Sequence, residues 1–233
     1  MTKRDFLGLV AGAGLVACSQ THSHVATAAA AEPYEGELAA FERADAANPP
    51  ASCSTLFLGS SSIRLWASLE QDFPDRPTLN RGFGGSTIAD SVRLFDRLVT
   101  PYRPAAIVFY AGENDISQGR SVERVFADFE ELLALKRARL GDTPMWFVSA
   151  KPTPARWTDR PAQVALNDKV RELSQNSGDL GFIDVASPML TLAGNPKDLF
   201  REDHLHMTAA GYRIWTNVVS AALQDAPLAP HCA

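Results

Sequence analysis

This chain has few cysteines and few long apolar runs, and its positive charges do not outnumber its negative ones. The 233 residues include three cysteines and no Cys-x-x-Cys pair, which argues against a zinc ribbon, a thioredoxin-type redox pair and a disulfide-dense mini-protein. Lysine and arginine number 22 against 27 aspartates and glutamates, for a formal net charge of -5. The chain therefore lacks the basic surface of a nucleic-acid-binding protein. With 45% hydrophobic and 21% charged residues, it has the composition of one ordinary globular domain.

The longest apolar run lies near the N-terminus and is too short to cross a membrane. Phe6 to Ala17 follows the basic pair Lys3 and Arg4. A membrane span needs about 20 apolar residues, whereas a shorter run after basic residues is typical of a signal peptide. We therefore predict that residues 1–17 are a signal peptide and that the protein is exported from a bacterial cytoplasm.

Two processing sites follow this run. Leu15-Val16-Ala17-Cys18 resembles the bacterial lipoprotein box, whose cysteine is lipidated after cleavage, while Ala26-Thr27-Ala28 fits the general signal peptidase. We favour the first, which predicts a periplasmic lipoprotein whose membrane contact is a lipid on Cys18. The small and polar residues 18–33 would form a flexible tether, and the folded domain would occupy residues 34–233.

The rest of the chain alternates between short apolar runs and helical patterns. Short runs that predict strands cover residues 55–58, 78–80, 105–110, 145–148 and 182–185, and most of them are continuously apolar, as in strands buried on both faces of a sheet. Apolar residues recur at helical spacing over residues 34–47, 122–140, 161–176 and 208–224. This alternation predicts right-handed crossovers and a parallel sheet with helices on both faces.

Chemically useful residues follow several of the predicted strands. Three serines lie in Gly59 to Ile63, three glycines in residues 80–87, and a Gly-Glu-Asn-Asp sequence in residues 112–115, while Asp203 and His206 precede the last helix. Ligands of such folds bind at the carboxyl ends of the strands. A hydroxyl, an imidazole, a carboxylate and hydrogen-bond donors gathered there would be suited to acyl transfer.

Four of these segments, in this order, resemble the motifs of the SGNH or GDSL-type hydrolases, and in particular the bacterial branch similar to the platelet-activating-factor acetylhydrolase group. The matching segments are Gly59-Ser60-Ser61-Ser62, Gly85 within residues 80–87, Gly112-Glu113-Asn114-Asp115 and Asp203-His204-Leu205-His206. The resemblance implies a flavodoxin-like three-layer α/β/α sandwich with a five-stranded parallel sheet. It also implies a serine ester hydrolase that uses no metal or other cofactor and acts on a small-molecule ester.

The resemblance assigns a role to single residues. The matching positions are Ser61 for the nucleophile, His206 for the base, Asp203 for its carboxylate partner, and Gly85, Asn114 and the Ser61 backbone for the oxyanion-hole donors. Where the family has Gly-Asp-Ser-Leu, this chain has Gly-Ser-Ser-Ser. The residues alone leave Ser60 and Ser62 open as nucleophiles, and only the alignment of the block selects Ser61.

The segment after the fourth predicted strand supplies candidates for substrate contact. Lys151, Arg156 and Trp157 could contact an acyl or sugar group, although a proline-stiffened loop packed on the domain explains them equally well. Because no long insertion separates the motifs, there is little chain for a lid. This favours short acyl or acetyl esters, including acetylated carbohydrate, and the family's range also includes lysophospholipids.

Two other functions compete with ester hydrolysis. Glu202, Asp203, His204 and His206 could form a metal site, because His-x-His is a common zinc-binding fragment, but no third histidine lies near them in the sequence. The altered first motif also fits a non-catalytic surface lipoprotein that binds carbohydrate or acyl groups.

Cys53 and Cys232 remain once Cys18 is assigned to the lipid. Disulfides persist in the oxidising compartment to which an exported protein is sent. Cys53 precedes the first predicted strand, at the end of the sheet opposite the predicted site, and the last helix would run back to that end. We therefore expect these two cysteines to pair.

Overall fold

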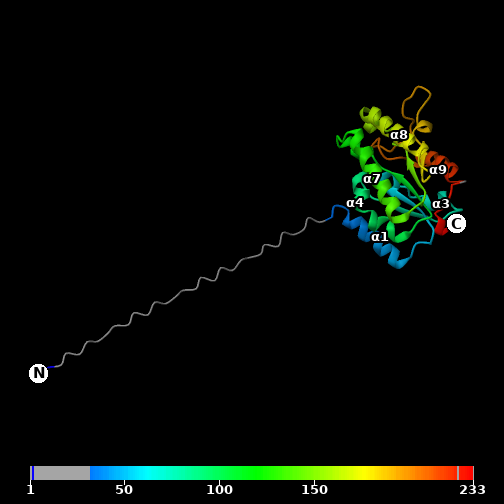
Figure 1. Ribbon diagram of the computed structural model, residues 1–233. Helices are drawn as coiled ribbons and strands as arrows, with labels where there is room; N and C mark the ends of the chain where they lie inside the picture. Colours follow the sequence, from blue (N-terminus) through cyan, green and yellow to red (C-terminus); the bar gives the residue numbers. More distant parts are fainter. Residues whose placement is uncertain (1, 3–31, 225, 233) are drawn as a thin grey trace. The chain divides into compact units, whose positions relative to one another are not determined.

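The computed structural model describes residues 2, 32–224 and 226–232, and Pro33–Ala233 forms one compact unit (Figure 1). The expected signal peptide, both processing sites, Cys18 and most of the expected tether lie outside the described residues, so export and lipidation stay predictions. None of the helices in the described ranges combines the length and the apolar character that a membrane crossing requires.

Five parallel strands form one sheet in the order β2-β1-β3-β4-β5. The strands are β1 Thr55–Gly59, β2 Thr78–Gly82, β3 Ala106–Tyr110, β4 Met145–Val148 and β5 Leu180–Ile183. This is the strand order of flavodoxin-like folds, in which the chain reverses its direction of winding between β1 and β3. The expected flavodoxin-like α/β/α sandwich is therefore confirmed.

Helices cover both faces of the sheet (Figure 1). Successive strand residues alternate between two cores, so that Leu56 and Leu58 belong to one and Phe57 to the other. The first core is covered by α1 Glu35–Ala47, α4 Ile88–Arg93, α5 Phe95–Leu98, α7 Val122–Leu140 and α8 Arg160–Gln175. The second is covered by α2 Ser61–Arg64, α3 Leu69–Asp72 and α9 Ala209–Leu223. The remaining short helices are α6 Glu113–Ser117, η1 Thr100–Tyr102, η2 Pro154–Asp159, η3 Ser187–Met189 and η4 Pro230–Cys232.

The four helices expected from apolar spacing are α1, α7, α8 and α9, and their ends lie within one residue of the expected ones. Local signals explain this agreement for α7. The Ser121 side chain accepts the N–H of Arg124 at the start of the helix, and Gly141 with a φ of 60° follows its last residue. Both ends are therefore specified by residues next to the helix.

The last strand differs from its prediction. The apolar run indicates a strand over residues 182–185, whereas β5 begins at Leu180 and ends at Ile183. Gly181 pairs in register with Trp146 of β4, and a Cβ on this glycine would come within 2.4 Å of the indole. The strand can include residue 181 only because it is glycine, a contact that the apolar pattern does not reveal.

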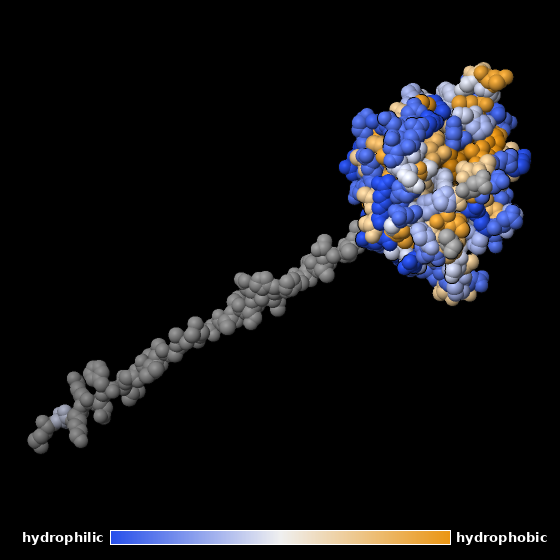
Figure 2. All heavy atoms as spheres, turned by 45° about the vertical axis from the view of Figure 1, so that its right-hand side comes forward, coloured by the Kyte–Doolittle hydropathy of each residue, from blue (hydrophilic) through white to orange (hydrophobic). Residues whose placement is uncertain are grey.

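Most large apolar side chains lie in the two cores. Polar residues cover much of the face seen in Figure 2, with smaller apolar areas between them. Within the described residues, the exposed large apolar side chains are Trp157, Val164, Leu192 and Leu228.

Cys53 and Cys232 form the expected disulfide, with Cα atoms 5.7 Å apart and a sequence separation of 179 residues. Cys53 lies just before β1. The neighbouring C-terminal segment is also attached by the N–H of Ala229, which donates to the carbonyl of Ala105 at the start of β3. The disulfide thus fastens the C-terminal segment to the amino ends of the central strands.

We expect the Cys53→Ser, Cys232→Ser double variant to lose about 2–4 kcal/mol of unfolding free energy, because the disulfide closes a very long loop in the unfolded chain. Urea unfolding monitored by circular dichroism measures this loss. Dithiothreitol should lower the stability of the wild type to that of the variant and should leave the variant unchanged. A wild type that is insensitive to dithiothreitol would contradict the disulfide.

Candidate active site

Ser61 is the first residue of α2 and comes directly after β1. The turn between them is pressed against β3. A Cβ on Gly59 would lie 1.9 Å from the carbonyl oxygen of Tyr110, and the φ of Gly59 is 142°. The N–H of Ser60 donates to the same carbonyl at 3.0 Å. Glycine at 59 therefore lets the chain turn close to β3 and places Ser61 at the carboxyl edge of the sheet.

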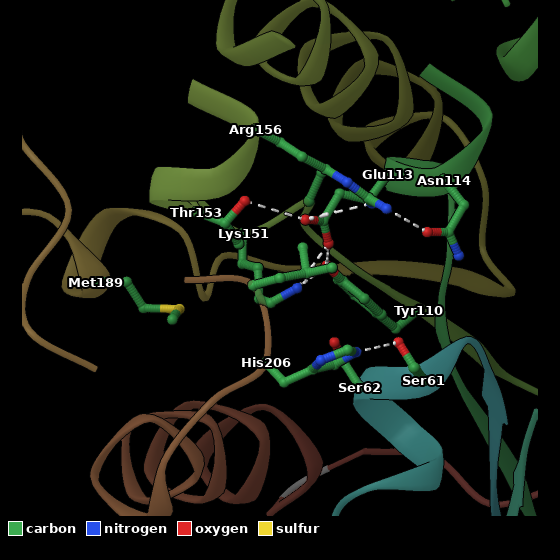
Figure 3. Close-up of polar contacts among 12 residues, drawn as sticks. Ser61, Ser62, Tyr110, Glu113, Asn114, Lys151, Thr153, Arg156, Met189 and His206 are labelled. Atoms are coloured by element: carbon green, nitrogen blue, oxygen red, sulfur yellow. Dashed lines mark hydrogen bonds and ion pairs between the residues drawn. The ribbon is translucent and has the colours of Figure 1, made fainter. Parts of the chain in front are cut away.

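Ser61, His206 and Asp203 form a continuous hydrogen-bonded series, and Figure 3 shows the contact between Ser61 and His206. His206 Nε2 lies 2.9 Å from Ser61 Oγ, and His206 Nδ1 lies 2.6 Å from Asp203 Oδ2. The other Asp203 oxygen accepts the N–H groups of Leu205 and His206, each at 2.9 Å. The hydrogen bond from the His206 ring, followed by these N–H groups, holds the pKa of Asp203 well below its usual range. The carboxylate therefore stays ionised beside the imidazole.

Side-chain and backbone contacts hold the two halves of this series together. The Tyr212 hydroxyl on α9 donates to the carbonyl of Ser62 on α2 at 2.9 Å. The N–H of Ala155 donates to the carbonyl of His204 at 3.1 Å, which joins the loop after β4 to the segment that carries His206. The imidazole is thus placed by α9 on one side and by the loop after β4 on the other.

The structure distinguishes the three serines that the sequence leaves open. Ser60 and Ser62 are buried, with 3% and 2% of their surface exposed, whereas Ser61 is partly exposed and lines a surface cleft together with His206. Ser60, at the position of the family's aspartate, makes no side-chain cap to α2. The loss of that aspartate has therefore not displaced Ser61 from the histidine.

Several hydrogen-bond donors near Ser61 are free to bind a ligand, as judged from the described part of the chain. Within the described residues, the backbone N–H groups of Ser61 and Gly85 have no hydrogen-bond partner. Asn114 Nδ2 donates to the carbonyl of Ser86 at 2.8 Å, which leaves its second hydrogen free. All three residues line the same cleft of about 550 Å³. They come from the segments that follow β1, β2 and β3, whose carboxyl ends lie in register.

Glu37 on α1 supports the glycine loop and was not anticipated from the sequence. The N–H of Gly84 donates to Glu37 Oε1 at 3.0 Å, and the Nε of Arg64 lies 3.6 Å from the same oxygen. Glu37 lies in an amphipathic helix with no motif around it, and no local signal marks it. Only the tertiary structure brings it to the loop that carries Gly85.

A buried ion pair lies beneath the cleft. Lys151 Nζ is 2.7 Å from Glu113 Oε2, and the two residues are only 1% and 2% exposed. The Tyr110 hydroxyl also donates to Glu113. Burial alone would raise the pKa of Glu113, but Lys151 and Arg156 together hold it below its usual range. Burial in turn lowers the pKa of the Lys151 ammonium.

The three residues expected to contact substrate lie in different places relative to the cleft. The expectation is wrong for Lys151, because its ammonium is enclosed with Glu113 and does not reach the cleft. Arg156 does line the cleft, where it also donates to Asn114 Oδ1 at 2.8 Å. Trp157 is 39% exposed but is not among the residues that line the cleft.

The residues of the rival metal site do not come together as ligands. Within the described ranges, the one close set of potential ligand atoms belongs to Cys53, His231 and Cys232, and its two sulfurs are joined in the disulfide. Glu202 and His204 form no such set with Asp203 and His206.

Asp115, the last residue of the Gly-Glu-Asn-Asp motif, ties two loops of the site together. Its carboxylate accepts the N–H of Ile88 at 3.1 and 3.2 Å, at the start of α4 and just after the Gly85 loop. Asp115 is completely buried. Burial raises the pKa of this carboxyl to about 6, against the opposing effect of the Ile88 N–H.

Comparison with known proteins matches residues 54–214 to the GDSL-like lipase/acylhydrolase family. A solved structure described as a platelet activating factor from Streptococcus pneumonia is 20% identical, with a TM-score of 0.70 over 82% of this chain and 92% of that chain. An acylhydrolase from Bacteroides fragilis is 21% identical, with a TM-score of 0.70 over 83% of this chain and 98% of that chain. A GDSL-like lipase from Bacteroides thetaiotaomicron is 19% identical, with a TM-score of 0.69 over 80% of this chain and 97% of that chain. A search of curated proteins found no significant match.

We expect Asp115→Asn to gain stability relative to the wild type as the pH rises. The folded-state pKa of Asp115 is about 6, above the unfolded value of about 3.9, so the folded state binds more protons between these values. Asp115 therefore lowers the wild-type unfolding free energy as the pH rises through this window, by about 3 kcal/mol in all. Urea unfolding of both proteins between pH 4 and pH 7 measures the difference, and a constant difference would refute this assignment.

Proposed function

This chain belongs to the GDSL-like lipase/acylhydrolase family and is a hydrolase of ester bonds, and we propose that it acts as a serine hydrolase with Ser61 as its nucleophile. The observation that carries the proposal is the hydrogen-bonded series from Ser61 through His206 to Asp203, with contacts of 2.9 and 2.6 Å. A hydroxyl becomes an effective nucleophile when an oriented base lies within hydrogen-bond distance.

In the first half of the reaction, Ser61 Oγ attacks the ester carbonyl carbon and His206 Nε2 takes the hydroxyl proton. The C–O bond to the alcohol then breaks, and the imidazolium gives this proton to the departing alkoxide. Asp203 holds Nδ1 protonated and stabilises the imidazolium. In the second half, water adds to the acyl-enzyme with His206 again as the base, which releases the carboxylic acid and restores the Ser61 hydroxyl.

The negative charge that develops on the carbonyl oxygen needs donors that are already in place. The free N–H groups of Ser61 and Gly85 and the free hydrogen of Asn114 Nδ2 are suited to this role. Two of them are backbone groups, one at the start of α2 and one in the loop after β2. Donors fixed in this way stabilise the tetrahedral intermediate without reorganising during the reaction.

The character of the cleft supports a small polar ester as the substrate. Charged or polar side chains from Glu37, Arg64, Asn114, Arg156 and His206 line it, and among the described residues Leu205 is the one large apolar side chain in its lining. A long acyl chain would find little apolar surface there, whereas hydroxyl groups would find polar partners such as Glu37 and Arg64. We therefore favour acetyl or other short acyl esters of polar alcohols such as carbohydrates.

A fluorophosphonate probe, which reacts with activated serines, tests the nucleophile. The wild type should be labelled and Ser61→Ala should not, because the probe needs a hydroxyl next to His206. Ser60→Ala and Ser62→Ala are the matched controls and should keep the label, provided that circular dichroism shows them folded. Equal labelling of Ser61→Ala and the wild type would refute the assignment.

A series of p-nitrophenyl esters from acetate to octanoate tests the acyl preference. An apolar acyl pocket would add about 0.8 kcal/mol, or roughly fourfold in kcat/KM, for each methylene that it buries. We expect no such increase, and the highest kcat/KM for acetate or butyrate. A steady rise up to octanoate, measured below the micelle concentration of each ester, would contradict the short-acyl preference.

A further inference from the structure

The side-chain amide of Asn114 is held from two sides. Arg156 Nη2 donates to its Oδ1 at 2.8 Å, and its Nδ2 donates to the carbonyl of Ser86 at 2.8 Å. A guanidinium can only donate and a carbonyl can only accept, so these two partners determine which end of the amide carries the nitrogen. Figure 3 shows Nδ2 turned away from Arg156. Reversing the amide would break both contacts.

Arg156 is itself held in place by the ion pair beneath the cleft. Its Nη1 lies 3.7 Å from Glu113 Oε1, and its side chain is only 17% exposed. The opposite oxygen of Glu113 is bound by Lys151 at 2.7 Å. A planar guanidinium that contacts two acceptors has little freedom to rotate. The position of the Asn114 amide is thus fixed, through Arg156, by groups that lie below the cleft.

This arrangement also places positive charge behind the amide. Two cations, Lys151 and Arg156, surround the single carboxylate of Glu113, so one positive charge is in excess. A charged donor on Oδ1 draws electron density from the amide and makes its remaining N–H a stronger donor. The effect would be largest where water is excluded, and Asn114 is only 8% exposed.

We infer that Arg156 is a positioning residue of the oxyanion hole, which orients and polarises the Asn114 amide and does not itself bind the substrate. This inference rests on the proposed function, because it assigns Arg156 to the same reaction. The charge on the oxyanion exists in the transition state and not in the bound ester. Loss of Arg156 should therefore lower kcat and leave KM nearly unchanged.

A double-mutant cycle with p-nitrophenyl acetate tests whether Arg156 acts through Asn114. Asn114→Ala should lower kcat by about 10²- to 10³-fold, as removal of an oxyanion donor does. Arg156→Ala should lower it by about 10- to 100-fold, through loss of a charge-assisted hydrogen bond. The double variant should be no slower than Asn114→Ala, because without the amide Arg156 has nothing to orient.

Arg64→Ala is the matched control. Arg64 lines the same cleft and carries the same charge, but it contacts Glu37 on α1. Its effect on kcat/KM should multiply with that of Asn114→Ala, since the two residues act separately. Non-additivity confined to Arg156 would thus reflect its contact with Asn114 and not a general loss of positive charge.

Arg156→Lys covers the case in which Arg156→Ala is poorly folded. Lysine keeps the charge but not the planar fork, so kcat should fall between the wild type and Arg156→Ala, with a thermal midpoint close to that of the wild type. The inference would be overturned if the reductions in kcat caused by Arg156→Ala and Asn114→Ala multiplied in the double variant. It would also be overturned if Arg156→Ala raised KM and left kcat unchanged. A wild type that the fluorophosphonate probe does not label would instead refute the proposed function.

Discussion

The carboxylate of Glu113 is buried where the loops after β3 and β4 meet, and a charge in that position must be neutralised by its surroundings. Lys151 supplies the opposite charge, and the Tyr110 and Thr153 hydroxyls supply hydrogen bonds. These contacts draw the loop after β4 onto α6. Arg156 then comes to lie beside Asn114, the residue that follows Glu113. One side of the cleft therefore depends on how this single buried charge is satisfied.

Much of the site could be predicted because its main residues lie in short segments at the ends of strands. Parallel strands buried on both faces read as continuous apolar runs, and their carboxyl ends must meet at one edge of the sheet. Ser61 and Asn114 follow such runs, and Gly85 follows the edge strand β2. Asp203 and His206 lie three residues apart, so that the aspartate can cap the backbone and bind the imidazole at once. For these residues, local sequence and topology together determine the position.

The features that could not be predicted all depend on contacts between distant segments. Lys151 looks like an accessible cation until its pairing with Glu113, 38 residues earlier, is known. Glu37 belongs to the site only because α1 packs beside the Gly84 loop. The start of β5 depends on the space that Gly181 leaves for Trp146. In each case the deciding partner lies elsewhere in the chain, and apolar periodicity carries no information about it.

The distance along the chain between Ser61 and His206 has a consequence for how the protein becomes active. They are 145 residues apart, and β2 to β5, α7 and α8 all come between them. A folding chain in which β1 to β4 have formed but residues 203–206 have not yet docked has the Ser61 hydroxyl and no base for it. Contacts so far apart in sequence form late in folding. The nucleophile therefore has no base, and stays unreactive, until the segment before α9 docks.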